Sequence, residues 1–329
     1  MYKALQETIA EMTAPGQMFS ISEVEVGGQT VKAWAMAPNS LRDIWLSTAG
    51  HADKDYLVYR DERWTYKQAH EEVARIANWL VANGIGQHDR VAIAMRNFPE
   101  WMLCYWAIAS IGAVSVGVNA WWVPEELKYG LKDSGTKLLI CDKERLARFD
   151  EVRDGFPDIK VVAVRVEDVP AWATPWSDVL KAEPVMPEVT IDPEHDACIF
   201  YTSGTTGSPK GAQLTHRGCV NNILSVVFGT MSQATAQAKS EGKAAPDLLA
   251  GGKTQTASIV ATPLFHVTAN NCLAQTATIG GGKLVHMHKW DAGEALRIIA
   301  VSYTHLRAHE TSLPIAYAVF GWQTGGGGG

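Results

Sequence analysis

The stretch that decides the fold is YTSGTTGSPKGA at residues 201–212, which continues from the apolar run ACIFY at 197–201. Its glycines allow the backbone to take a positive φ and to approach a ligand closely, so that successive N–H groups can converge on one anion. The serine and threonine hydroxyls add donors, and Lys210 adds a positive charge. An open α/β sheet normally binds its ligand where a strand ends in such a loop. The stretch therefore predicts a phosphate-binding loop.

This loop differs from the P-loop of kinases and GTPases, which requires G-x-x-x-x-G-K-[ST]. Here Pro209 precedes Lys210, and Gly211 follows it. The segment TSGTTGSPKG at 202–211 instead resembles the signature loop of the adenylate-forming enzymes, the superfamily of acyl-CoA synthetases, peptide-synthetase adenylation domains and firefly-type luciferases. A P-loop ATPase is accordingly the weakest of the functions that we consider.

Helical and strand patterns alternate on both sides of the loop. Thr65 and Gln68 have the spacing of a capping box, and apolar residues then recur at helical spacing until Gly84. Further strands are expected at 91–95, 114–118, 137–141, 160–166, 197–201, 257–261 and 283–286, and further helices at 99–111, 124–132, 144–153, 216–227 behind a cap at Thr215, 267–278 and 291–300. Strands separated by such helices predict parallel βαβ units and therefore an α/β fold. Residues 233–253 are small and polar, which predicts an exposed excursion.

Two more stretches carry the resemblance. Residues 119–142, NAWWVPEELKYGLKDSGTKLLICD, are similar to the first-lobe pattern of the family, and PLFHV at 263–267 is similar to the stretch that contributes to its acyl pocket. The resemblance implies the two-lobed parallel-sheet core of an adenylate-forming N-terminal domain, in incomplete form. We expect an N-terminal extension at 1–40, a first α/β lobe at 41–194, a second lobe with the phosphate-binding loop at 195–300, and a tail at 301–329. A polar, proline-containing gap at 168–194 marks the boundary between the lobes.

The tail, VSYTHLRAHETSLPIAYAVFGWQTGGGGG, departs from the family abruptly. In the family the chain continues with a Tyr-Gly-x-Thr-Glu segment for adenine and Mg²⁺, an aspartate for the ribose, and a C-terminal domain whose lysine assists adenylation. The sequence contains none of these, so we interpret the chain as a fragment that lacks its C-terminal domain, with a non-native tail. Because adenylation requires all these groups to be held together, we expect the chain alone to have no more than trace activity.

The resemblance implies an AMP-forming acid–thiol ligase, most closely an acyl-CoA synthetase for a fatty acid or a related carboxylate. Such an enzyme would use ATP and Mg²⁺ to form an acyl-AMP and then transfer the acyl group to coenzyme A. It assigns catalysis to Lys210 and Thr206. It assigns nucleotide binding to Thr202, Ser203, Gly204, Thr205, Thr206, Gly207, Ser208, Pro209, Lys210 and Gly211. His266, within PLFHV, is expected at the substrate pocket, although a lone histidine beside an apolar segment is more often structural.

Two other functions stay open. A peptide-synthetase adenylation domain would share the loop, but the sequence at 119–127 looks more like that of acyl-CoA synthetases. A non-catalytic nucleotide-binding module is the other alternative, because half of the family's site is absent from the sequence.

Composition and local patterns further limit the partners, location and metal sites that we expect for this protein. The net charge of −6 without a basic stripe argues against a nucleic-acid partner. The N-terminus carries acids and no long apolar run, and the five cysteines form no C-x-x-C pair, so we expect a cytoplasmic protein with reduced thiols. His286 and His288 form H-x-H without a third ligand at suitable spacing, and we expect no metal site there.

One stretch is long enough to cross a membrane. Residues 101–118 carry no charge. However, Pro99 and Glu100 are typical of a helix start, and Gly112 is typical of a helix end. We therefore predict a buried helix followed by a buried strand, and no transmembrane segment.

Overall fold

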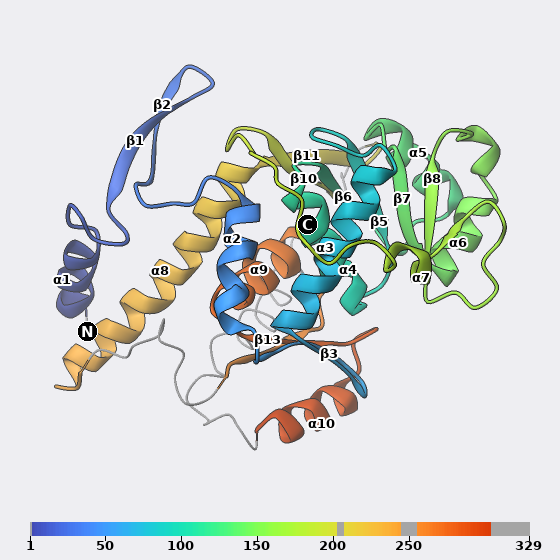
Figure 1. The fold of residues 1–329 in the computed structure, drawn as a ribbon. Coiled ribbons are helices and arrows are strands. Elements are labelled where there is room, and N and C mark those ends of the chain that lie inside the picture. Colours follow the sequence, from blue (N-terminus) through green and yellow to red (C-terminus); the bar gives the residue numbers. More distant parts are fainter. Residues whose placement is uncertain (1, 203–206, 245–254, 304–329) are drawn as a thin grey trace, which may run out of the picture.

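Helices and strands alternate along most of the chain, as the sequence predicts (Figure 1). The computed structural model describes residues 2–202, 207–244 and 255–303. The strands are β1 (Ile21–Val26), β2 (Gln29–Trp34), β3 (Asp55–Tyr59), β4 (Glu62–Thr65), β5 (Arg90–Ala94), β6 (Val114–Gly117), β7 (Leu138–Asp142), β8 (Lys160–Val164), β9 (Thr174–Pro175), β10 (Asp196–Thr202), β11 (Lys210–Thr215), β12 (Ala257–Val260) and β13 (Lys283–His286). The helices are α1 (Tyr2–Met12), α2 (Leu41–Ser47), α3 (Tyr66–Ala82), α4 (Pro99–Ser110), α5 (Pro124–Asp133), α6 (Lys143–Asp150), α7 (Trp176–Val179), α8 (His216–Ser240), α9 (Gln275–Ile279) and α10 (Ala292–Tyr303), with 3₁₀ turns η1 (Thr48–His51) and η2 (Arg153–Gly155) and a π-helix η3 (Thr268–Ala274).

The larger sheet has seven strands in the order β11-β10-β6-β5-β7-β8-β9. All neighbours in it are parallel except β10 and β11, which form an antiparallel hairpin. Helices α4, α5 and α6 follow β5, β6 and β7 in turn. The expected parallel βαβ units and the α/β fold are therefore confirmed.

The smaller sheet has the order β12-β13-β3-β4, and only β4 runs antiparallel to its neighbour. Strands β3 and β4 were not predicted from the sequence. Strand β3 lies beside β13, more than two hundred residues later in the chain, whereas β10 joins the larger sheet beside β6. Each sheet thus draws strands from both sides of residue 195, so the expected division into residues 41–194 and 195–300 is not the division between the sheets.

Two apolar clusters pack on opposite faces of the larger sheet, because successive residues of a strand point to opposite sides. Ala92 belongs to the cluster that includes Leu127 of α5. Val91 belongs to the other cluster, which contains α3 and α4 and also Leu57 and Leu284 of the smaller sheet. Helices α3 and α4 therefore lie between the two sheets, and Figure 1 shows α10 on the far side of the smaller sheet.

Helix α4 explains the membrane-like stretch at 101–118. Every one of its 12 residues is buried, because both sheets cover it. A helix that is apolar all round is expected in such a place as well as in a membrane. The helix ends at Ser110, and β6 follows, as the sequence predicts. No helix in the described part of the chain combines the length and the apolar character needed to cross a bilayer.

The region after the loop differs from the sequence-based prediction in two ways: one strand was not predicted, and one helix is longer than expected. Residues 210–215 form strand β11, although its mostly exposed side chains give no strand pattern. Helix α8 does begin behind a cap at Thr215, but it continues to Ser240, so residues 233–240 are not an excursion. Ser232 and Ala236 are buried on this part of the helix, which contacts α1. Tertiary contact with the N-terminal helix supplies the apolar partner that the local sequence lacks.

Candidate functional site

The predicted phosphate-binding loop connects β10 to β11. Thr202, the last residue of β10, pairs with Lys210, the first residue of β11. Gly207 has a φ of 105°, a conformation that strains any residue with a side chain. Gly207, Ser208 and Lys210 are exposed, and Pro209 is half-buried. The loop thus presents polar groups and a cation to solvent at the end of a buried strand.

Part of the expected cradle cannot be placed. Ser203, Gly204, Thr205 and Thr206 lie outside the described residues, so their assigned roles stay predictions.

Helix α5 holds both ends of the loop. The Tyr129 hydroxyl donates to the carbonyl oxygen of Pro209 at 3.1 Å, and the Tyr201 hydroxyl donates to a carboxylate oxygen of Asp133 at 2.7 Å. Burial and the adjacent Asp133 raise the pKa of Tyr201 above its ordinary value, which keeps the hydroxyl protonated as a donor. A Cβ on Gly211 would lie 2.9 Å from Ile199 Cγ2, so the hairpin packs closely only because residue 211 is glycine.

The loop shares one edge of the sheet with three other connections. Because β10, β6, β5 and β7 are parallel, their carboxyl ends meet at the same edge. Thr202 ends β10, Arg96 and Asn97 follow β5, Trp121 follows β6, and Asp142 ends β7. This edge is where the candidate site must lie.

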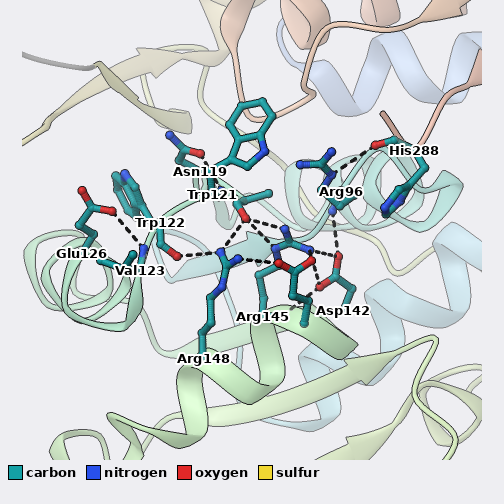
Figure 2. A network of polar contacts seen from close by, with 12 residues as sticks. Arg96, Asn119, Trp121, Trp122, Val123, Glu126, Asp142, Arg145, Arg148 and His288 are labelled. Atoms are coloured by element: carbon teal, nitrogen blue, oxygen red, sulfur yellow. Dashed lines mark hydrogen bonds and ion pairs between the residues drawn. The ribbon is translucent and has the colours of Figure 1, made fainter. Parts of the chain in front are cut away.

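At the point where the strand order reverses, between β5 and β7, the chain's own side chains interact (Figure 2). Asp142 accepts the backbone N–H of Arg96 at 3.0 Å and pairs with Arg145 Nη1 at 3.0 Å, and both side chains of the pair are buried. Arg145 also donates through Nε and Nη2 to the carbonyl oxygen of Ala120, at 2.8 and 2.6 Å. Open α/β sheets often bind ligands at such a reversal. Here the polar groups satisfy one another, which leaves the β6–β10 side of the edge for a ligand.

The same network fixes the connection after β6, as Figure 2 shows. Arg148 Nη1 donates to the carbonyl oxygens of Ala120 and Trp122 at 2.9 and 2.8 Å. Between these two anchored residues Trp121 remains 53% exposed. Its ring lies 5.1 Å from the Arg96 guanidinium and makes an edge contact with Phe265 at 5.2 Å between ring centroids. An exposed tryptophan therefore lies at this edge of the sheet.

The PLFHV segment reaches this edge from the other sheet. Phe265 is buried, and its Cα lies 3.4 Å from the position that a Cβ on Gly117 would occupy at the end of β6. Phe200 of β10 packs against Gly117 as well, 2.9 Å from the same position. His266 is exposed beside Phe265, and desolvation lowers its pKa, which favours the neutral imidazole. The PLFHV segment thus reaches the ends of β6 and β10, the strand that leads into the loop.

The two histidines of the H-x-H pattern, His286 and His288, have different environments. His286 is 2% exposed, and burial lowers its pKa to about 3. His288 is half-buried beside Phe98. Over residues 2–202, 207–244 and 255–303, no group of three or more His, Cys, Asp or Glu is arranged to hold a metal ion.

Comparison with known proteins identifies the family. The family model described as AMP-binding enzyme matches residues 45–308. The chain belongs to this AMP-binding enzyme family. The match extends past residue 300, where the sequence resemblance was expected to stop. The recognition of an adenylate-forming enzyme from the loop is therefore confirmed.

Several curated relatives in this family are acid–CoA ligases. The chain is 28% identical to 4-coumarate–CoA ligase 2 of Petroselinum crispum over 250 residues, which are 75% of this chain and 42% of the relative. It is 31% identical to crotonobetaine/carnitine–CoA ligase of Salmonella heidelberg over 193 residues, which are 54% of this chain and 36% of the relative. The chain spans less than half the length of these curated relatives.

Solved structures of this family share the fold. The anthranilate CoA ligase AuaEII in complex with anthranoyl-AMP superposes with a TM-score of 0.67 at 20% identity, over 80% of this chain and 48% of that chain. The N-terminal domain of FACL13 from Mycobacterium tuberculosis superposes with a TM-score of 0.59 at 26% identity, over 79% and 60% of the two chains. The expected α/β core of an adenylate-forming N-terminal domain is confirmed.

Proposed function

We propose that this chain forms the phosphate-binding part of an AMP-forming acid–CoA ligase, which activates a carboxylate with ATP and then forms a thioester with coenzyme A. The proposal rests mainly on one observation. The ends of the signature loop, Thr202 and Lys210, lie at the same sheet edge as the PLFHV segment with His266, in a chain of the AMP-binding enzyme family.

The residues of the loop fit a polyphosphate. Lys210 is exposed and forms no ion pair with any residue that the structure describes, so its charge is free to balance phosphate. The left-handed Gly207 turns the backbone sharply, which suits a loop whose N–H groups surround an anion. We assign to Lys210 and Thr206 the stabilisation of charge on the departing pyrophosphate, a role that preorganised donors perform well. Mg²⁺ enters only as the counter-ion of the ATP phosphates.

The carboxylate substrate belongs near His266. A carboxylate is a poor electrophile until one of its oxygens becomes part of a good leaving group. Formation of the acyl-AMP mixed anhydride from ATP, with release of pyrophosphate, achieves this. Neutral His266 lies next to Phe265, whose ring contacts the exposed Trp121. The CoA ligases of this family are named for coumarate and crotonobetaine or carnitine. We infer a fatty acid or a related carboxylate as the substrate class.

Nucleotide binding by the loop can be measured on the 329-residue chain. Titration calorimetry with ATP is expected to show binding that Lys210→Ala weakens at least tenfold, because removal of one charged donor from a preorganised phosphate site costs on the order of 2 kcal/mol. Lys67→Ala, an equally exposed lysine on α3, serves as the matched control and should bind ATP normally. Equal ATP affinity for Lys210→Ala and the unaltered chain would contradict the assignment of the loop.

The reaction type is tested separately. In a protein that continues this sequence to the length of its relatives, carboxylate-dependent exchange of pyrophosphate into ATP is the result expected for a ligase. Release of inorganic phosphate without a carboxylate would instead indicate an ATPase. Nucleotide binding without exchange would indicate a non-catalytic module. Transfer of the acyl group to a carrier-protein thiol, and not to coenzyme A, would indicate a peptide-synthetase adenylation domain.

A further inference from the structure

Asn97 connects the two sheets beside the candidate site. It follows β5 of the larger sheet and is only 5% exposed. Its Nδ2 donates to the carbonyl oxygens of Val260 and Thr262, at 3.1 and 3.0 Å. Its Oδ1 accepts the backbone N–H of Leu264 at 3.0 Å. One side-chain amide thus binds three points of the segment that leads from β12 to His266.

In these contacts both the nitrogen and the oxygen of the side-chain amide form hydrogen bonds. A buried backbone carbonyl or N–H without a partner is costly, so the segment is held where all three hydrogen bonds can form. Leu264 and Phe265 are buried directly after the last of these contacts. The next residue is the exposed His266. The position of Asn97 therefore determines how the histidine segment stands over the end of β6.

On the side away from Asn97, the segment that carries Phe265 is also closely packed. Phe265 lies against Gly117, and its ring contacts Trp121, whose loop is anchored by Arg148. Packed interiors tolerate small displacements poorly, and catalytic geometry is more sensitive still. A shift of the segment would thus move Phe265 away from Trp121 and move His266 relative to the end of β6.

We propose that Asn97 is a positioning residue for carboxylate activation, which fixes the segment at 260–264 so that Phe265 and His266 lie at the end of β6. The carboxylate part of this inference rests on the proposed function. Asn97 itself need not touch a substrate, because both polar atoms of its amide are already engaged.

The informative variant is Asn97→Asp, which keeps the size of the side chain and replaces both N–H donors by an oxygen that repels the two carbonyls. Asn78→Asp is the matched control. Asn78 Nδ2 likewise donates to two carbonyl oxygens, those of Glu183 and Val185, at 2.8 and 2.7 Å. These contacts lie away from the site. Should Asn97→Asp fail to fold, Asn97→Ser, which keeps a small neutral donor and acceptor, replaces it.

The first measurement does not depend on activity. The protein is labelled with 5-fluorotryptophan, and the ¹⁹F resonance of Trp121 is assigned with Trp121→Phe. Asn97→Asp is expected to shift or broaden this resonance, because Phe265 moves relative to the indole, whereas Asn78→Asp leaves it in place. A Trp121 resonance that is identical in Asn97→Asp and the unaltered chain would overturn the positioning role.

The second measurement separates positioning from a merely structural effect. In the protein that shows carboxylate-dependent pyrophosphate exchange, Asn97→Asp is expected to raise the KM for the carboxylate at least tenfold and to leave the KM for ATP within twofold. A lowered melting temperature with both KM values unchanged would contradict the inference. If the unaltered protein shows no exchange, the proposed function fails, and the fluorine resonance still decides whether Asn97 positions the segment.

Discussion

Gly130 shows how a single side chain decides packing in this protein. It lies within α5, where glycine is normally unfavourable by roughly 1 kcal/mol relative to alanine. A Cβ at this position would lie 2.3 Å from Cζ3 of the buried Trp122 ring. The absence of a side chain lets the helix approach the tryptophan, and Trp122 in turn contacts Tyr201 before the phosphate-binding loop.

Gly130→Ala is therefore expected to destabilise the protein, although alanine favours helices. Overpacking of a close-packed site costs roughly 1–3 kcal/mol, which exceeds the gain in helix propensity. Gly229→Ala in α8 is the matched control, because a Cβ there meets no atom within 4 Å. Denaturant titrations should show a lower free energy of unfolding for Gly130→Ala and an equal or higher one for Gly229→Ala. A stabilised Gly130→Ala would show that Trp122 can move aside.

At the scale of elements, local signals set where helices begin. Thr65 caps α3 and forms the predicted capping box with Gln68. Thr215 caps α8, and its hydroxyl accepts the N–H of Gly218 at 3.1 Å. After the other end of α8, Gly242 takes a φ of 67°, and the N–H of Lys243 donates to the carbonyl oxygen of Ala238 at 2.8 Å, which is a glycine cap; the helix also contacts α1. Helix starts were thus predicted correctly from the sequence, whereas α8 was expected to end at residue 227 because Gly242 lies inside the excursion expected at 233–253.

Thr215→Ala should lower the free energy of unfolding by about 1 kcal/mol, the usual cost of losing a threonine cap. Thr230→Ala makes the same chemical change inside the same helix, at an exposed position where the hydroxyl bonds only the carbonyl of Val226. Because alanine is the better helix former, that control should be neutral or slightly stabilising. Equal losses for the two variants, measured by thermal and chemical unfolding, would mean that the cap contributes nothing specific.

At the scale of the whole molecule, ion pairs help to join the two sheets. Arg165, directly after β8 of the larger sheet, pairs through Nη2 with Glu62 of β4 at 2.7 Å and through Nε with Glu100 of α4 at 2.9 Å. Burial raises the pKa of Glu100, and the arginine opposes this effect. The Arg165 guanidinium, which follows β8 of the larger sheet, thus joins β4 of the smaller sheet and helix α4.

Arg165→Met should destabilise the protein by about 3–5 kcal/mol, because it leaves the buried carboxylate of Glu100 without its partner. The double variant Arg165→Met with Glu100→Gln should recover much of this loss, because the uncompensated charge is then absent. A double-mutant cycle of unfolding free energies measures the coupling. Additive effects of the two substitutions would show that the pair does not interact.

Stability should also fall in mild acid. His216 is buried at the start of α8, its Nδ1 accepts the N–H of Leu41 at 3.2 Å, and desolvation lowers its pKa to about 4. The unfolded chain binds a proton near pH 6.5 and the folded chain only near pH 4, so the stability contributed by the neutral ring is lost as pH falls through this interval. The loss at pH 5 amounts to about 2 kcal/mol.

The variant His216→Gln tests this dependence. Its free energy of unfolding should change less between pH 7 and pH 5 than that of the unaltered chain, because one titrating group is removed. His88→Gln serves as a control at an exposed position. If the pH dependence of His216→Gln matches that of the unaltered chain, other groups cause the acid sensitivity.

Sequence by itself determined the features that are encoded over short distances. Glycines, hydroxyl residues and Lys210 within one loop indicate phosphate binding because the backbone conformation and the donors are local properties. Capping residues and apolar periodicity fixed the βαβ units from β5 to β8 for the same reason. The apolar stretch at 101–118 was correctly divided into a helix and a strand by its flanking proline, glutamate and glycine.

Only the tertiary structure decided which distant segments meet. The pairing of β3 with β13, the packing of α8 against α1 and the three contacts of Asn97 all join residues whose local sequences carry no mark of one another. Hydrogen bonds and apolar burial depend on proximity in space, and a long chain offers many partners with the same local pattern. For this reason the loop could be recognised from its residues, whereas the site around it required the folded chain.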